Sequence, residues 1–203
     1  MDIGSLVMQS FEAYRSFQQA HPLLGSMLTS SVIYPLSDIV SQAIVDRHID
    51  WKRVRYSAIL SAPYGLGTYG LMQTGDLVEH FISDHPLAKA ALGPNLFANA
   101  YNLFFFFNNS VGKKSNYSFV ALGQAYTQAF KAGKESWGKF KAYLNDNIPK
   151  QAYWSSVATV LTAWNAFQWY NFSEIPHELQ TPATITASLV WTILISAWSL
   201  KNK

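Results

Sequence analysis

The chain of 203 residues contains no cysteine and little charge. Without cysteine it forms no disulfide bond, has no thiol nucleophile and cannot build a cysteine-based metal site. Only 15 basic and 12 acidic side chains are present, which gives a formal net charge of +3 at pH 7. Because the basic residues gather between hydrophobic segments, membrane topology explains them better than a nucleic-acid partner does. We therefore expect no nucleic-acid ligand.

Motifs that carry catalytic chemistry are also missing from the sequence. It has no His-Glu pair at metal-binding spacing, no phosphate-binding Gly-Lys-Ser/Thr loop and no Gly-x-Ser-x-Gly nucleophile elbow. The five histidines all fall at the ends of hydrophobic segments or in loops: His21, His48, His80, His85 and His177. We expect neither a metal nor a cofactor, and no catalytic residue is assigned from the sequence.

Five stretches of twenty or more residues lack Asp, Glu, Lys and Arg altogether. They cover residues 16–37, 56–75, 90–112, 151–173 and 179–200. A helix of about twenty residues, at about 1.5 Å rise per residue, crosses the hydrocarbon core of a bilayer. The alternative is a soluble all-α domain that buries uncharged helices, but five such helices leave a chain of this length little charged surface to dissolve it.

The sequence therefore predicts an all-α membrane protein that forms a single integral-membrane domain over residues 1–203. Its five predicted transmembrane helices cover approximately 22–45, 56–82, 94–111, 151–172 and 183–200. In the segment 115–150, residues 115–130 are uncharged and residues 131–150 alternate lysines with aromatic and aliphatic side chains. This pattern predicts an interfacial amphipathic helix, with a solvated helix as the alternative. Pro176 and Pro182 are expected to bracket a tight turn before the last span.

The distribution of basic residues supports five crossings. With five spans, 13 of the 15 Lys and Arg residues fall on one side, in segments 46–55 and 113–150 and at the C-terminal end. The other side receives only Arg15 and Lys89. Such asymmetry is what the positive-inside rule describes.

Polar residues recur at helical spacing within the predicted spans, so each set shares one helix face. The clearest set is the amide row Asn95, Asn99 and Asn102 in the third span. Small and hydroxyl residues at such spacing let helices pack closely and hydrogen-bond to one another. The alternative is a polar lumen between the helices, which the amide row favours because three amides exceed what packing requires.

Asp38 is the only acidic residue well inside a predicted span. An ionisable side chain at such a depth is costly and normally faces a partner or a cavity. Gln42, one helical turn on, is the expected partner, and Pro35 frees a backbone carbonyl nearby. The alternative is a tilted helix that brings Asp38 close to the membrane surface.

The C-terminal part of the chain resembles a known membrane-protein family. Its stretch Trp164-Asn-Ala-Phe-Gln168-Trp-Tyr-Asn171-Phe172-Ser-Glu-Ile-Pro176, followed by Trp191 and Ser196, is similar to the signature of the Mpv-seventeen and peroxisomal membrane protein family. His21-Pro22, Asp38 with Gln42, and Asp50 with Arg53 resemble motifs of its N-terminal half. Trp154 and Trp164 precede Ser155 and Asn165, where the family has prolines, so the chain resembles a divergent member.

The resemblance implies a small multi-pass protein of an organelle membrane, either the mitochondrial inner membrane or the peroxisomal membrane. Members of this family are usually described with four spans and are thought to form or regulate pores for small solutes. The residues of the signature are expected to be structural: Trp154, Trp164, Gln168, Asn171, Phe172, Pro176 and Trp191.

The leading functional hypothesis is a channel or pore for small solutes, with Asp38, Gln42, Asn95, Asn99 and Asn102 as its functional candidates. One alternative is an integral-membrane enzyme that acts on a lipophilic substrate with Asp38 as acid or base. Another is a non-catalytic membrane scaffold. The expected partners are the lipid bilayer, small solutes and, as an open alternative, further copies of the same chain.

Overall fold

The computed structural model describes the backbone of residues 2–201, and all side chains there except those of residues 152, 192 and 194–203. The described chain is helical and contains no strand, so the all-α prediction is confirmed. Its elements in order are α1 (Ile3–Ala20), α2 (Pro22–Val45), α3 (Trp51–Phe81), α4 (Pro86–Leu92), α5 (Pro94–Lys114), α6 (Phe119–Glu135), α7 (Trp137–Asn147), α8 (Lys150–Thr159), the π-helical segment η1 (Val160–Trp164), α9 (Asn165–Glu174) and α10 (His177–Lys201).

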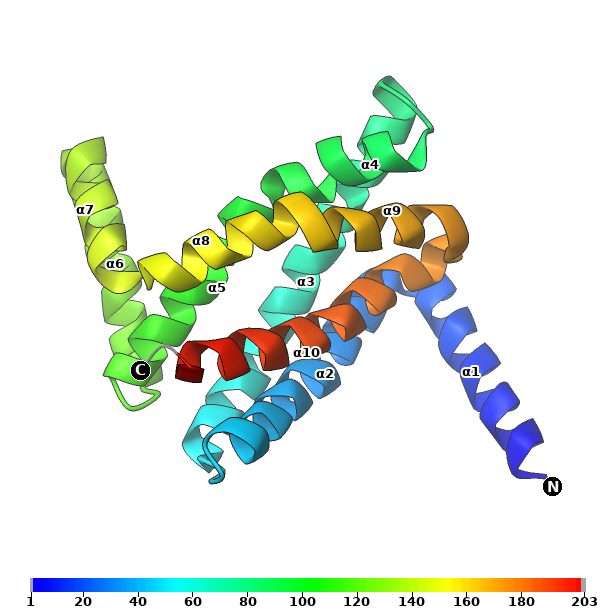
Figure 1. Ribbon diagram of the computed structural model, residues 1–203, viewed down its shortest axis with the longest axis horizontal. Helices are drawn as coiled ribbons and strands as arrows, with labels where there is room; N and C mark the ends of the chain where they lie inside the picture. The colour runs from blue at the N-terminus through cyan, green and yellow to red at the C-terminus, as the bar shows by residue number, and fades with distance from the viewer. Residues whose placement is uncertain (1, 202–203) are drawn as a thin grey trace.

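The long helices form a bundle in which α2 packs against both α3 and α10 (Figure 1). Segments α8, η1 and α9 follow one another as one rod, in which α8 and η1 pack against α5 and α9 packs against α4. Helix α1 projects from one end of this bundle, and the α6–α7 pair lies at the other end. Proline opens α2, α4 and α5 at a position where its missing N–H costs no hydrogen bond. Asp50 caps α3 by accepting the backbone N–H of Lys52 at 2.9 Å.

Several helices differ from the predicted segments. Helix α1 has no counterpart among them, and residues 115–150 form two helices because Ser136 ends α6 and caps α7. The expectation that Pro182 closes a turn is wrong. Helix α10 already begins at His177 and carries Pro182 inside it, so the turn after α9 contains only Ile175 and Pro176.

Helix α2 places mainly polar side chains inside and large apolar side chains outside, while other helices contribute a buried apolar cluster that includes Tyr56, Phe106 and Phe107. On α2, Leu24, Leu28, Val32 and Leu36 follow one another at steps of four residues and are exposed. The opposite face of α2 is buried and consists of Gly25, Ser26, Ser30, Tyr34, Ser37, Asp38, Ser41 and Gln42. A soluble protein arranges its helices the other way round, with the apolar face inward.

Among the described helices, α2 is the one that is both long enough and apolar enough to cross a membrane. It has 24 residues, and its most apolar window reaches a mean hydropathy of 1.3. The other segments fall short of that length and composition within the described residues. The five-span membrane bundle therefore stays a prediction, whereas the helical fold is established.

Candidate functional site

A cavity of about 760 Å³ lies between α2, α3, α5, η1 and α10, and we call it the central cavity. It reaches the surface beside the turn of residues 46–50, because the exposed side chains of Asp46 and His48 belong to its lining. Its inner end lies at Met72, Gln168 and Thr184. Cavities of this size hold small organic molecules.

Asp38 lies near the surface end of the central cavity, and both of its carboxylate oxygens have partners. Arg53 Nη2 is 2.7 Å from Asp38 Oδ1, and Gln42 Nε2 donates to Asp38 Oδ2 at 3.0 Å. Arg53 also reaches Asp46, with Nη1 3.3 Å from Asp46 Oδ2. The side chain of Asp38 is thus buried as an ion pair rather than as an isolated charge.

The turn between α2 and α3 holds this charge cluster in place. Gln42 joins the turn to the cluster, because its Oε1 accepts the backbone N–H of Asp50 at 2.6 Å and its Nε2 donates to Asp38. Asp50 in turn caps the helix that carries Arg53. Arg53 is the partner that sequence reasoning missed, although its place in the first turn of α3 could have suggested that it faces the end of α2.

Tyrosines line the middle of the central cavity and satisfy one another's polar groups. Tyr101 donates its hydroxyl to the backbone oxygen of Tyr64 at 3.0 Å and lies 3.3 Å from Thr68 Oγ1. The hydroxyl of Tyr64 accepts from Asn108 Nδ2 at 3.2 Å. The rings of Tyr34 and Tyr64 meet edge to face at 5.7 Å. This aromatic lining offers both apolar faces and hydroxyl groups to a small polar molecule.

The asparagine row of α5 faces the rod formed by α8, η1 and α9. Asn95 Nδ2 donates to Asn165 Oδ1, and Asn102 Nδ2 donates to Ser156 Oγ at 2.6 Å. Of the row, Asn102 lines the central cavity together with Asp38, whereas Asn95 and Asn99 are not among its lining residues. The Oδ1 atoms of Asn95 and Asn99 are buried without a hydrogen-bond partner.

The rod opposite this row contains the π-helical segment η1, which contributes Val160 and Trp164 to the cavity wall. A π-helical turn inserts an extra residue into the hydrogen-bond ladder and is common at functional sites. The segment ends beside Asn165, the position at which the resembled family carries proline. The sequence pattern does not reveal this segment. Helices α8 and α9 adjoin it directly, so no break in the helical pattern marks it.

The signature residues gather at the hairpin between α9 and α10. Asn171 Nδ2 donates to the backbone oxygen of Gln180 at 3.1 Å and to Thr184 Oγ1 at 3.0 Å. Gln168 Nε2 donates to the same Thr184 oxygen at 3.2 Å. Phe172 packs with Met72 and Ala90. These contacts join the two helices at the inner end of the central cavity.

The remaining signature residues are dispersed. Trp164 and Trp191 line the central cavity, whereas Trp154 and Pro176 are exposed. The side chain of Ser196 lies outside the described residues. The signature thus combines cavity-lining residues with residues that contact no part of the cavity.

A second, small cavity of about 260 Å³ lies at the other end of α2, α3 and α10. It is lined by Gln18, Gln19, Pro22, Ser26, Tyr69, Met72, Gln73, Asp76, His177, Glu178, Gln180 and Thr181. It reaches the surface because Gln19, Pro22 and His177 are exposed. Sequence reasoning did not anticipate this cavity, since its lining comes from four helices and includes α1.

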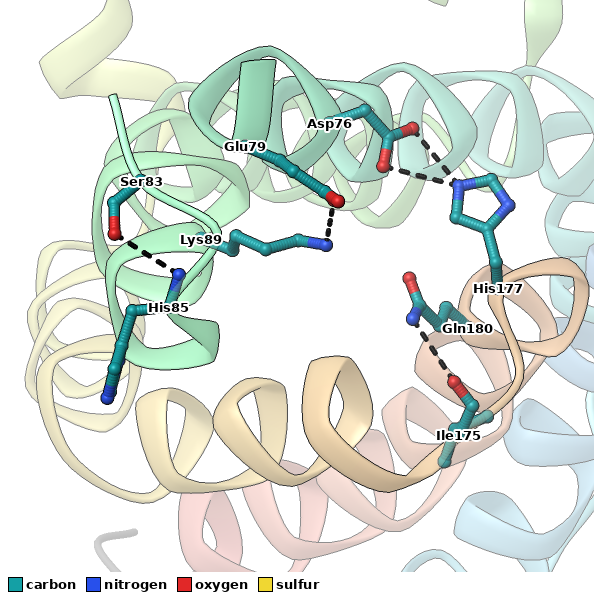
Figure 2. A network of polar contacts seen from close by, with 8 residues as sticks. All are labelled: Asp76, Glu79, Ser83, His85, Lys89, Ile175, His177 and Gln180. Carbon is teal, nitrogen blue, oxygen red and sulfur yellow. Dashed lines mark hydrogen bonds and ion pairs between the residues drawn. The ribbon is translucent and has the colours of Figure 1, made fainter. Parts of the chain in front are cut away.

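Charged residues near the small cavity form a network of polar contacts (Figure 2). His177 Nε2 lies 3.2 Å from Asp76 Oδ1, and the buried Lys89 pairs with Glu79 while its ammonium lies 5.1 Å from the centre of the Phe172 ring. Gln180 donates to the backbone oxygen of Ile175 at 3.1 Å. The Asp76–His177 pair joins α3 to α10 at the small cavity, whereas the Lys89–Glu79 pair joins α3 to α4 outside its lining.

Glu178 also lines the small cavity, and it joins α1 to α10. Arg15 Nε donates to Glu178 Oε1 at 2.6 Å, and Gln19 Nε2 donates to the same oxygen at 3.0 Å. The backbone N–H of Glu178 and then the hydrogen bond from Arg15 lower the pKa of this carboxyl below its ordinary value. Among the described residues, no three His, Asp or Glu side chains are grouped so that they could hold a metal ion.

No protein-family model, curated protein or solved structure matches this chain. The resemblance to the Mpv-seventeen and peroxisomal membrane protein family therefore stays a prediction that rests on the motif residues of the sequence. The features that bear on function are the two cavities and the arrangement of polar and apolar surfaces around them.

Proposed function

We propose that the protein is a membrane channel for small polar solutes and that the central cavity is the main part of its solute path. The observation that carries this proposal is a cavity of about 760 Å³ whose wall combines apolar side chains with polar and charged ones, beside a helix, α2, whose outward face is apolar. Lipid cannot satisfy polar groups, so residues of this kind in a membrane face the bundle interior or water. In water, the same bundle would expose an unusually large apolar surface.

The orientation of α2 supports the membrane setting. Its exposed leucines and valine would contact lipid, while Asp38 and Gln42 would face the path. The central cavity opens beside the loop of residues 46–50, which belongs to the basic side of the five-span prediction. An organelle membrane, as the family resemblance implies, is the setting that we propose.

The charge cluster at the surface end suggests which solutes enter. Arg53 is shared between Asp38 and Asp46, so this group of three side chains carries one net negative charge when all are ionised. Further inward the lining has no charged side chain and combines tyrosines, threonines and amides with apolar residues such as Leu60, Leu71 and Phe105. Small neutral or cationic polar solutes therefore suit the path better than anions do.

The enzyme hypothesis has less support. Both oxygens of Asp38 are engaged by Arg53 and Gln42, which favours a charged structural pair over an acid or base that exchanges protons with a substrate. The scaffold hypothesis leaves the central cavity without a role. No observation favours either of them over the channel.

The experiment is reconstitution of the purified protein in liposomes loaded with polar solutes of graded size. We expect release of small solutes and retention of solutes too large for the central cavity. Asp38→Asn removes one negative charge beside Arg53, and at about 1 kcal/mol for neighbouring unit charges in water it should raise the anion-to-cation permeability ratio roughly fivefold.

Asp84→Asn is the matched control, because Asp84 is exposed and does not line either cavity. Circular dichroism and thermal unfolding establish that each variant is folded. Wild-type liposomes that release no more solute than protein-free liposomes would refute the channel. Equal permeability ratios in wild type and Asp38→Asn would remove Asp38 from the path.

A further inference from the structure

The two cavities follow one another along the same three helices. On α2, the small cavity touches Pro22 and Ser26, and the central cavity begins at Tyr34. On α10, Thr181 lines the small cavity and Thr184 lines the central cavity. These two threonines are three residues apart, a rise of about 4.5 Å along the helix. The partition between the cavities is therefore about one helical turn thick beside α10, and it is thicker beside α2, where Ser26 and Tyr34 are about 12 Å apart along the helix.

Met72 of α3 lines both cavities and lies in this partition. Its side chain is 3% exposed, and its sulfur is 3.5 Å from Thr184 Oγ1. On the other side it packs against Ala90 and Phe172. The side chain thus fills the space between the hydrogen-bonded threonine and an aromatic ring.

The surroundings of Met72 are fixed, whereas Met72 itself is flexible. Thr184 accepts from Asn171 and Gln168 and donates to the backbone oxygen of Gln180 at 2.9 Å, so it cannot move without breaking several bonds. Phe172 packs directly against α3 at Gly75, where an added Cβ atom would come within 2.5 Å of its ring. Methionine has no branch and three side-chain torsions before its terminal methyl, so it can change rotamer without a shift of the backbone.

We propose that the small cavity is the second vestibule of the solute path and that the Met72 side chain is the plug that closes the path between the two vestibules. This inference rests on the proposed channel function and adds the position of its constriction. In the structure the plug is in place. A change of Met72 rotamer joins the two cavities into one route from the opening beside residues 46–50 to the opening beside His177.

The test uses wild type, Met72→Ala and Met72→Leu in the same loaded liposomes. Removing most of the plug should raise the release rate of small solutes at least severalfold in Met72→Ala. Leucine, of similar volume, should keep the rate within about twofold of wild type. Thermal unfolding establishes that the variants are folded, and Met72→Leu keeps the comparison informative if the alanine variant is unstable.

The absence of cysteine in the chain allows a second readout. Met72→Cys should react with a small methanethiosulfonate reagent, and the attached group should lower solute release until a reducing agent removes it. Leu66→Cys is the control, because Leu66 lies on the same helix but on its exposed face. Its modification should leave release unchanged.

The possible outcomes separate the plug from the channel. Equal release by wild type and Met72→Ala, with no effect of the thiol reagent on Met72→Cys, would overturn the plug and leave the channel standing. Faster release by Met72→Ala than by wild type, with Met72→Leu near the wild-type rate, would support both. No release by any of these folded variants would overturn both.

Discussion

Two walls of the central cavity are built in different ways. The first, the close-packed wall, consists of α2 and α3, and the second, the amide wall, consists of α5 against the rod of α8, η1 and α9. The close-packed wall brings two backbones together through small residues. The amide wall keeps them further apart and fills the space with asparagine side chains.

Contacts in the close-packed wall involve backbone atoms directly. Ser30 donates its hydroxyl to the backbone oxygen of Ser61 at 2.7 Å. At Gly65, an added Cβ would lie 2.2 Å from Ser30 Oγ and 2.5 Å from the backbone oxygen of Ser26. Only glycine permits this approach, so the spacing of the two helices is fixed by the sequence at this point.

Contacts in the amide wall run between side-chain ends. Asn102 reaches Ser156 and Asn95 reaches Asn165, while buried oxygens of Asn95 and Asn99 have no partner. Side-chain amides can exchange partners with one another or with water at little cost, whereas backbone packing cannot. The close-packed wall therefore sets the shape of the path, and the amide wall is the side that can adjust.

The largest effect is expected at Gly65. Gly65→Ala must push α2 and α3 apart, because one of the overlapping atoms is a backbone oxygen that cannot rotate away. We expect a loss of about 1–3 kcal/mol in stability, measured as a lower denaturation midpoint in detergent. Gly70→Ala is the control on the same helix, since nothing lies within 4 Å of its added Cβ.

The control should be neutral or should stabilise the protein by up to about 1 kcal/mol, because alanine favours a helix more than glycine does. Equal stability of Gly65→Ala and Gly70→Ala would show that the two helices are free to separate. The distinction between a fixed and an adjustable wall would then fail.

A smaller effect is expected in the amide wall. Asn102→Ala and Ser156→Ala each remove one end of a 2.6 Å hydrogen bond and should cost about 1 kcal/mol. The double variant should cost less than the sum of the two, with a coupling of at least about 0.5 kcal/mol. Thermal unfolding of the four proteins measures this coupling.

Asn99 provides the comparison for that cycle. Its Oδ1 has no partner, and neither Asn102 nor Ser156 is hydrogen-bonded to it. Asn99→Ala combined with Ser156→Ala should therefore be additive. If the Asn102 cycle is additive as well, the hydrogen bond contributes nothing and the amide wall is held by other contacts.

The sequence predicts the close-packed wall better than the amide wall. The bounds of α2 follow from Pro22 at its start and from the polar turn at Asp46. The spacing of serines and glycines in α2 and α3 predicts close packing against a neighbouring helix. The partners of Asp38 and Asn102 come from other helices, and spacing along one helix carries no information about them. The three-dimensional structure is therefore needed to identify Arg53 and Ser156 as these partners.

Other misses have local causes. Helix α1 is amphipathic, and it ends before the first predicted span, which begins at residue 22, so the span pattern does not predict it. The position of Pro182 within α10 contradicts the rule that proline marks a boundary. Near the start of a helix a proline removes only one hydrogen bond, and the burial of its ring offsets part of that loss.

The smallest effect is expected at a contact that belongs to neither wall, the attachment of α1 to α10 through Glu178. The carboxyl has a lowered pKa in the folded protein, so the stability it contributes is fully present above the ordinary pKa of glutamate. This contribution is lost as the pH falls through the lowered pKa. Acidification should therefore loosen α1 while the two walls stay intact.

A spin label at Ser10→Cys, on the exposed face of α1, reports this change as increased mobility at low pH. Glu178→Gln should show the mobile spectrum already at neutral pH and no further change in the same window. Glu174→Gln, which alters an exposed carboxyl of α9, should behave like wild type. If Glu178→Gln keeps the wild-type pH dependence, the attachment of α1 does not depend on the ionised Glu178.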